Sequence, residues 1–240
     1  MRSSRVGVAL VTLVALLMPM TVAQATPLAA VRAAATYPTC TLPESDAEAL
    51  VILSNYYPGY WWDHTDLTIA VQAHPKATAA EVNAVRAAMA TWSTVLNACF
   101  DGLITLTDVT DSARNPQRAD MVVHFVPHAG GARFGGMAIC GAHGCPNILV
   151  RSENPPSWGS QPYSPQLIEW IALHEIGHAL GLGHTTNLLE STDIMGYGWP
   201  QLGEPVLSQC DVEALAYIFA WAIEGTEPTR PGPGPYECSG

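Results

Sequence analysis

The sequence predicts an α/β (α+β) domain built on a small mixed β-sheet. The expected elements follow the order β-α-β-β-β-α-α along the chain. The chain has 240 residues, of which 48% are hydrophobic and 13% are charged, so it can bury a core and is too apolar for a disordered protein. A chain of this length is expected to hold one domain.

The first half of the domain is expected to contain a strand, a helix and two further strands. Residues 67–72 are rich in β-branched side chains and predict a strand. A helix is expected from Thr78 to Asn97, because Thr78 and Glu81 form a T-x-x-E capping box. Strands are then expected at 103–109 and 121–126. Apolar residues recur in the helix every three or four positions and predict one buried stripe, formed by Val82, Val85, Met89, Trp92 and Leu96.

The second half is expected to contain a short strand and two helices. Residues 148–151 predict the strand. Ser164 followed by Pro165 is a strong start signal for a helix, and Gly181 is expected to end it. Ser208 opens the last helix with an acidic residue in its first turn.

The N-terminus predicts export from the cell. Arg2 and Arg5 precede an apolar run at 6–20, and residues 23–25 form an A-x-A cleavage site, so residues 1–25 are interpreted as a signal peptide. The alternative is a membrane anchor, but the run is shorter than the roughly 20 residues that a span needs. We therefore expect a secreted, extracellular protein that leaves the membrane after signal cleavage.

The remaining chain is divided into an N-terminal leader segment at 26–60, a main domain at 61–225 and a Pro/Gly-rich tail at 226–240. Ten Lys and Arg against 21 Asp and Glu give a net charge of −11. This balance excludes a general nucleic-acid binder, which needs basic side chains for phosphate contacts. Nothing in the sequence indicates an oligomer, so a monomer is expected.

The six cysteines predict disulfide bonds, because an even number in an exported protein usually forms pairs. Cys140 and Cys145 bracket a tight loop and form the first expected pair, although a metal site with His143 between the two thiols is an alternative. The full predicted pairing is Cys140 with Cys145, Cys210 with Cys238, and Cys40 with Cys99.

The segment 174–184, HEIGHALGLGH, fits the pattern H-E-x-x-H-x-x-G-x-x-H at every fixed position. His174 and His178 are four residues apart in the expected helix, so their imidazoles lie on the same face. Gly181 allows a backbone conformation that ends the helix and turns the chain, which brings His184 to the same metal. Three imidazoles and one open position are typical of a catalytic zinc ion.

Glu175 follows the first ligand and is not needed to bind the metal. Zinc lowers the pKa of a bound water, and a neighbouring carboxylate can take its proton and deliver it to a leaving amine. The predicted reaction is hydrolysis of a peptide bond by a zinc-bound water that Glu175 activates, without a covalent intermediate.

The motif resembles that of the metzincin zinc metallopeptidases, and the resemblance continues downstream. Residues 193–197, DIMGY, are similar to the Met-turn, in which the methionine, here Met195, forms an apolar floor under the zinc ligands. Within the metzincins the chain is most similar to a bacterial-type secreted matrixin domain (peptidase family M10). The strand at 120–125 and the helix start at 207–212 carry this similarity, which covers about residues 60–222.

The resemblance implies a zinc-dependent endopeptidase that acts on protein or peptide substrates. It also implies a twisted mixed sheet with an active-site helix, the Met-turn and a C-terminal helix. Residues 135–140 would form an edge strand that pairs with extended substrate, and residues 196–207 would wall the pocket beside the zinc.

The chain departs from the matrixin pattern at several positions. The second, structural zinc of matrixins is not expected, because only His128 and His143 lie in the right region and the aspartate is missing. Acidic residues are few around 130–150, so the sequence leaves calcium open. Tyr197 stands two residues after Met195, which is similar to astacins and serralysins, whose tyrosine approaches the zinc and stabilises the transition state. The alternative for Tyr197 is a packed Met-turn aromatic.

Further alternatives concern regulation and function. Cys40 lies in PTCTLP, which distantly resembles the matrixin cysteine switch but lacks its Arg and Gly, so a disulfide is favoured. The protein could also be a metzincin of a non-matrixin branch, or a secreted binding module that holds zinc without hydrolysing anything. The Tyr and Trp residues at 56–62 suggest a sugar-binding strip as a further alternative, which leaves the zinc motif unexplained.

Overall fold

The structure is a computed structural model that describes residues 37–44, 49–51, 61–112, 116–126, 135–141, 144–153, 162–198, 202–232 and 234–238. All of them belong to one compact unit, residues 35–240. The expected signal peptide at 1–25 lies outside the described residues. Within the described part of the chain, no helix has both the length and the apolar character needed to cross a membrane.

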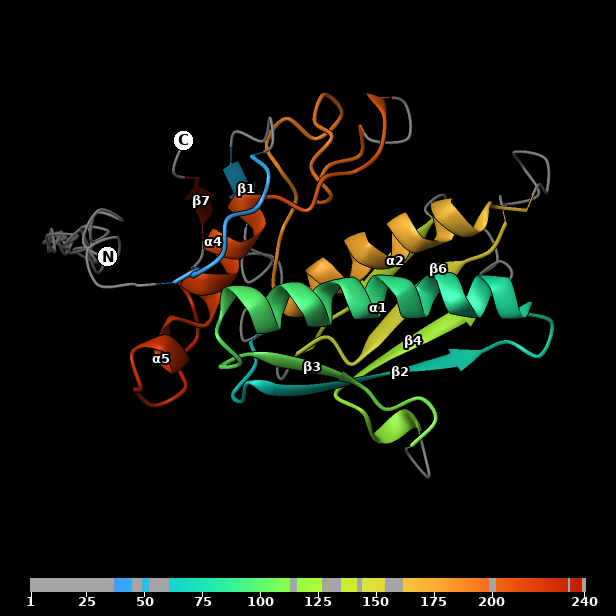
Figure 1. The fold of residues 1–240 in the computed structure, drawn as a ribbon, viewed down its shortest axis with the longest axis horizontal. Helices are drawn as coiled ribbons and strands as arrows, with labels where there is room; N and C mark the ends of the chain where they lie inside the picture. The colour runs from blue at the N-terminus through green and yellow to red at the C-terminus, as the bar shows by residue number, and fades with distance from the viewer. Residues whose placement is uncertain are drawn as a thin grey trace, which may run out of the picture. The chain divides into compact units, whose positions relative to one another are not determined.

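A mixed five-stranded sheet forms the base of the unit, as the sequence predicts (Figure 1). Its strands in spatial order are β3 (Thr105–Asp108), β2 (Asp66–Ala73), β4 (Met121–Val126), β6 (Asn147–Arg151) and β5 (Gly136–Ile139). The first four strands run parallel, and β5 pairs antiparallel with β6 at one edge. The expectation of an edge strand at 135–140 is therefore confirmed.

Two helices cover one face of this sheet (Figure 1). Helix α1 (Ala79–Cys99) begins at the predicted capping box of Thr78 and Glu81 and runs two residues beyond the predicted end. Helix α2 (Pro165–Leu180) begins at Ser164, whose side chain accepts the backbone N–H of Leu167, and ends at Gly181. The predicted stripe of α1 packs toward the core, where Val85, Met89, Trp92 and Leu96 are buried.

A hydrogen bond joins the two helices inside the core. The indole N–H of Trp92 on α1 donates to the backbone carbonyl of Leu173 on α2 over 2.9 Å. Trp92 is fully buried, so this bond forms without competing water. The long helix α1 thus supports the middle of α2, immediately before the histidine motif begins.

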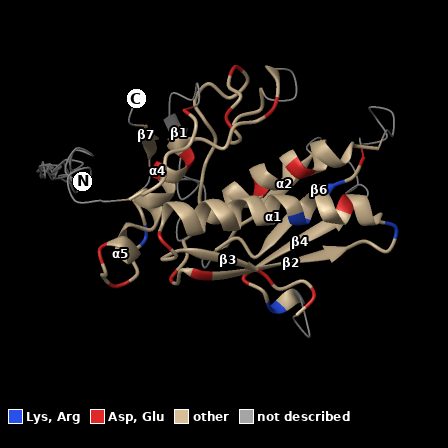
Figure 2. Ribbon diagram, in the orientation of Figure 1, with Lys and Arg blue, Asp and Glu red and all other residues tan. Residues whose placement is uncertain are grey.

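Among the described residues, acidic ones outnumber basic ones along the ribbon (Figure 2). Arg86 on α1 is paired with two carboxylates from the end of β3 and the turn after it. Its guanidinium lies 2.8 Å from Asp108 and 2.8 Å from Asp111. Because this pair is exposed, it contributes little to stability.

The last part of the chain forms helices α4 (Gln209–Ile218) and α5 (Ala220–Ile223). Helix α4 begins at Ser208, as predicted, with a second capping box formed with Asp211. The apolar face of α4 joins the main core through Val212, Leu215 and Ile218.

Two short strands that the sequence did not predict join the leader to the tail. Strand β1 (Ala49–Val51) pairs antiparallel with β7 (Pro235–Glu237). Leu50 is completely buried and also forms a bridge with Thr185, the residue after the third histidine of the motif. The leader therefore contacts the residue that follows this histidine, and the tail pairs with the leader.

The three predicted disulfide bonds are confirmed: Cys40–Cys99, Cys140–Cys145 and Cys210–Cys238. The Cys40 thiol is consumed in its bond, so it is not available to the metal as a cysteine switch. The bond between Cys140 and Cys145 likewise excludes a thiolate metal site there, and His143 lies outside the described residues.

Candidate metal centre

The three histidines of the motif converge in space. The ring nitrogens that they offer lie within 4.8 Å of one another. His174 and His178 stand on the last two turns of α2, with ring centroids 4.5 Å apart, and His184 comes from the segment after Gly181. The sequence prediction that a helix spacing of four residues plus a turn would assemble these three side chains agrees with this geometry.

Backbone carbonyls orient two of the three rings. The Nδ1–H of His174 donates to the carbonyl of Ile194 over 2.6 Å, and the Nδ1–H of His178 donates to that of Leu182 over 2.9 Å. A carbonyl can only accept, so in the neutral imidazole the proton sits on Nδ1. The Nε2 lone pairs are then left for a metal, as is usual for oriented histidine ligands.

The site fits a metal ion on two observations. The Nε2 atom of His174 is buried and has no hydrogen-bond partner, which is costly unless a ligand occupies it. The Nε2 atoms of His178 and His184 lie 3.0 Å apart, and two imidazole nitrogens this close need a proton or a cation between them. Three neutral imidazoles are the ligand set that zinc accepts.

Burial keeps the rings neutral. It lowers the pKa of His174 to about 3 and that of His184 to about 4, and it lowers the pKa of His178 well below its ordinary value. The charged form of an imidazole is disfavoured in a dry site. All three side chains are therefore in the form that binds a metal.

Glu175 is buried between α2 and the edge strand. Burial raises the pKa of its carboxyl to about 8, although a hydrogen bond from the backbone N–H of Ala138 on β5 acts in the opposite direction. Apart from this amide, the site supplies the carboxylate with little solvation, and a nearby cation would favour its charged form. The carboxyl is not among the three converging side chains, but its charge acts on Tyr197, whose hydroxyl contacts His184.

Gly181 and Met195 complete the centre. Gly181 has a φ of 119°, which disfavours any other residue, and its N–H caps the last turn of α2. Met195 is fully buried beneath the helix. A methyl group placed on Gly177 would lie 2.5 Å from the sulfur of Met195, so the thioether packs directly against the turn that carries His178.

A buried polar cluster holds the Met-turn in place. Asp193 accepts the N–H of Met195 over 2.8 Å and the hydroxyl of Ser208 over 2.7 Å. Asp211 accepts the N–H of Ser208 over 2.7 Å. Burial and the charge of Asp193 raise the pKa of Asp211 well above its usual value. The start of α4 therefore fixes the turn whose Ile194 carbonyl orients His174.

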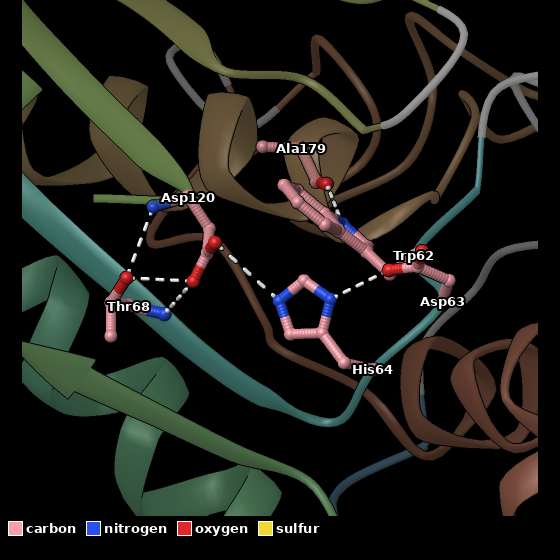
Figure 3. A network of polar contacts seen from close by, with 6 residues as sticks. All are labelled: Trp62, Asp63, His64, Thr68, Asp120 and Ala179. Atoms are coloured by element: carbon pink, nitrogen blue, oxygen red, sulfur yellow. Dashed lines mark hydrogen bonds and ion pairs between the residues drawn. The ribbon is translucent and has the colours of Figure 1, made fainter. Parts of the chain in front are cut away.

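Trp62 contacts the last turn of α2, the helix that carries His174 and His178. Figure 3 shows its indole N–H pointing at the carbonyl of Ala179, one residue after His178, and the distance is 2.8 Å. Trp62 is only 5% exposed, so it is a packing residue and offers no sugar-stacking face. Tyr56, Tyr57 and Tyr60 of the suggested sugar-binding strip lie outside the described residues.

Tyr197 lies at the open side of the histidines. Its hydroxyl is 2.6 Å from Nε2 of His184, and the side chain is 42% exposed. Burial and the charge of Glu175 raise its pKa to about 12, so the phenol keeps its proton. A neutral hydroxyl at this place can donate a hydrogen bond to an anionic oxygen.

The structure brings together all the site residues that the sequence singled out, and it adds others. Sequence reasoning did not find Trp62, Asp193 or the Ala138 amide. Neither the buried Trp62 nor the backbone N–H of Ala138 belongs to a sequence motif that would indicate its role. Asp193 stands in the Met-turn segment, so its position was noted there but its buried partners at α4 were not.

Fold and site together define a zinc metalloprotease fold of the metzincin type. The sequence profile of the matrixin family, Peptidase_M10, matches residues 60–220. This match spans more than half of the chain, and the protein belongs to the matrixin family. The alternative of a metzincin from a non-matrixin branch is thereby set aside.

Individual relatives agree with this assignment. The interstitial collagenase of Bos taurus is 27% identical over 181 residues, which cover 71% of this chain and 35% of the collagenase. That of Oryctolagus cuniculus is 26% identical over 182 residues, with the same coverage. This chain thus spans about a third of the length of the collagenases it matches. An archaemetzincin from Methanopyrus kandleri covers 65% of this chain and 97% of its own, at 14% identity and a TM-score of 0.43, a likeness too loose to support a conclusion.

Proposed function

We propose that this protein is a secreted zinc-dependent endopeptidase that hydrolyses peptide bonds in protein or peptide substrates. The observation that carries the proposal is the convergence of three neutral imidazoles beside one buried carboxyl group, that of Glu175. A purely structural zinc site would gain nothing from burying a carboxyl group next to the metal, because an unpaired buried charge is costly.

His174, His178 and His184 would hold the zinc ion. Bound there, zinc would polarise the scissile carbonyl and make a water molecule more acidic. Glu175 then has the role of general base. Its carboxylate takes a proton from the attacking water and passes it to the leaving amine, and the Ala138 amide orients it meanwhile.

Strand β5 is the proposed site of substrate binding. Among the described residues it lies at the edge of the sheet and pairs with β6 alone. An extended peptide can pair with such a free edge through backbone hydrogen bonds. Met137 and Ile139 are 36% and 44% exposed on this strand and would contact apolar side chains of the substrate.

Tyr197 is proposed to stabilise the transition state. Its hydroxyl keeps its proton and reaches the rim of the metal centre at His184. There it can donate to the oxyanion that forms from the substrate carbonyl. The exposed position of Tyr197 fits this role better than that of a packed Met-turn aromatic.

The remaining parts of the proposal concern the whole protein. Residues 1–25 would be removed on secretion, and residues 26–60 would lead into a catalytic domain at 61–225 with a short tail. The three disulfides fit an oxidising, extracellular location. The protein is proposed to act as a monomer, with one catalytic zinc ion and no structural zinc.

The test is hydrolysis of a peptide library by the purified secreted protein, next to a Glu175→Gln variant, with the zinc content of both measured. The wild type should cleave, a chelator should stop it, and the variant should keep one zinc ion and lose activity by more than about a hundredfold. A Tyr197→Phe variant should keep its zinc and lose kcat on the order of a hundredfold.

Two outcomes would contradict the proposal. If wild type and Glu175→Gln bind zinc equally and neither cleaves, the protein is a zinc-containing binding module. If Glu175→Gln cleaves as fast as the wild type, Glu175 is not the general base.

A further inference from the structure

The edge strand holds a glycine, Gly136, at a place where a side chain would strike the carboxyl of Glu175. A methyl group on Gly136 would lie 2.5 Å from Cγ of Glu175 and 2.7 Å from its Oε1. Carbon atoms in folded proteins do not approach this closely. Gly136 is not among the described glycines with a positive φ, so its backbone conformation does not require glycine. Glycine is required at this position because the Glu175 side chain fills the space where a side chain would lie.

Strand β5 also binds the Glu175 carboxyl through a backbone N–H, two residues after Gly136. The backbone N–H of Arg151 on β6 donates to the carbonyl of Gly135 over 2.9 Å. Backbone groups alternate in direction along an antiparallel edge strand, so residues 136 and 138 direct theirs away from β6. The Ala138 amide points to the free edge, where it meets Glu175. Strand β5 therefore offers Glu175 a donor at 138 and clearance at 136.

We propose that Gly136 is a positioning residue for the general base. Its missing side chain lets the Glu175 carboxylate rest against β5, in reach of the Ala138 amide. The inference rests on the proposed function of Glu175. The three atoms that would lie nearest to a methyl group on Gly136 all belong to the Glu175 side chain.

The substitution Gly136→Ala should spare the fold and disturb the site. The atoms in the way are the outer part of a flexible side chain and not backbone, so the carboxylate can move aside at small cost. It would then leave the Ala138 amide and lose its place beside the histidines. A displacement of about 1 Å in a reacting group can cost two orders of magnitude in rate.

Gly141 provides the matched control on the same part of the chain. A methyl group on Gly141 would meet nothing within 4 Å, and its φ is not positive. Gly141→Ala therefore makes the same chemical change, five residues away, without touching Glu175.

The experiment compares wild type, Gly136→Ala and Gly141→Ala in four measurements: kcat and KM on a cleaved peptide, zinc content, melting temperature, and hydrogen exchange of the Ala138 amide by NMR. We expect Gly136→Ala to keep its zinc and its melting temperature, to lose kcat at least about tenfold with KM changed less than about twofold, and to exchange the Ala138 amide faster. Gly141→Ala should match the wild type in all four.

Several results would overturn the inference. Equal kcat in the two variants would show that position 136 does not affect the base. A loss of zinc or a large drop in melting temperature in Gly136→Ala would assign the glycine a structural role. If the wild type cleaves no peptide, the proposed function fails, and the exchange of the Ala138 amide still decides the inference. Exchange as slow in Gly136→Ala as in the wild type would then refute it.

Discussion

Two of the proposed zinc ligands stand on a long capped helix, and the third stands on a segment without regular secondary structure. His174 and His178 belong to what we call the sheet region, the described residues of 61–180, in which α1 and α2 pack on the five-stranded sheet. His184 and Met195 belong to the clasp region, the described residues of 37–51 and 182–238.

Both regions contribute to one apolar core, and each is also held by contacts of its own. In the sheet region, the buried hydrogen bond of Trp92 joins the two long helices. The clasp region is further held by the disulfide Cys210–Cys238, by the short pair β1–β7 and by the buried cluster around Asp193. The metal centre lies where they meet, so its geometry depends on a strong scaffold on one side and on long-range ties on the other.

The largest effect is expected from cutting the covalent tie between the regions. Cys40 of the clasp is bonded to Cys99 at the end of α1, with a sequence separation of 59. Replacing both by alanine should lower the free energy of unfolding by about 4 kcal/mol, because the unfolded chain regains the entropy of that loop. The free energy of unfolding is measured by urea denaturation of the variant and the wild type. A loss no greater than that from removing the Cys140–Cys145 disulfide, which closes a loop with a sequence separation of 5, would contradict this expectation.

A smaller loss is expected where the regions touch at Met195. Gly177→Ala would place a methyl group 2.5 Å from the Met195 sulfur and 3.3 Å from the Trp92 ring. Overpacking of this kind should cost about 1–3 kcal/mol in urea unfolding. In a Met195→Ala background the same substitution should cost less, since the thioether is gone. Equal costs in both backgrounds would show that Met195 does not press on Gly177.

Inside the clasp, stability should depend on pH through Asp211. The pKa of this carboxyl is raised in the folded state by burial and by Asp193. The folded protein therefore favours the protonated form, and this contribution is complete at low pH and declines as the pH rises toward the folded pKa. Asp211→Asn does not titrate, so its stability relative to wild type should grow from pH 5 to pH 8. A constant difference across this range would contradict the prediction.

The smallest effect is expected in the sheet region, at His64. Burial alone would lower the pKa of His64, but Asp63 and Asp120 outweigh it and raise the pKa (Figure 3). This stabilisation is present below the unfolded pKa and is lost as the pH rises through the folded one. His64→Gln should cost less than about 1 kcal/mol at pH 5.5, since the group is partly exposed, and nothing at pH 9. A cost that is the same at both pH values would point to packing instead of charge.

The same division explains what could be predicted from the sequence. The sheet region shows its structure locally. Ser164 and Gly181 delimit α2, the spacing of His174 and His178 follows from the helix, and Thr78 begins α1. Each of these signals lies within a few residues of the element that it defines, so tertiary contacts were not needed to recognise it.

Most tertiary contacts of the clasp region could not be predicted in this way. Leu50 pairs with Tyr236, which is far away in the sequence. Their strands have three residues each and are too short to show the alternation of apolar and polar residues that is typical of a strand. The contact between Asp193 and Ser208 joins the Met-turn to the start of α4. Each of these residues also has a local role, so neither sequence pattern indicates that the two side chains meet. In the sheet region, the role of Gly136 likewise depends on a side chain that the fold brings to it. In the clasp region, local signals predicted the helix start at Ser208 and the Met-turn at 193–197, and the disulfides were predicted because cysteines pair with one another.

The most direct test of the account is the zinc X-ray absorption spectrum of the wild type beside that of His184→Ala. One zinc ion is expected on ligands from both regions. The spectra should show three imidazole nitrogens at about 2.0–2.1 Å in the wild type and two in the variant, with weaker zinc retention. An unchanged spectrum in His184→Ala, or a sulfur ligand in the wild type, would contradict this expectation.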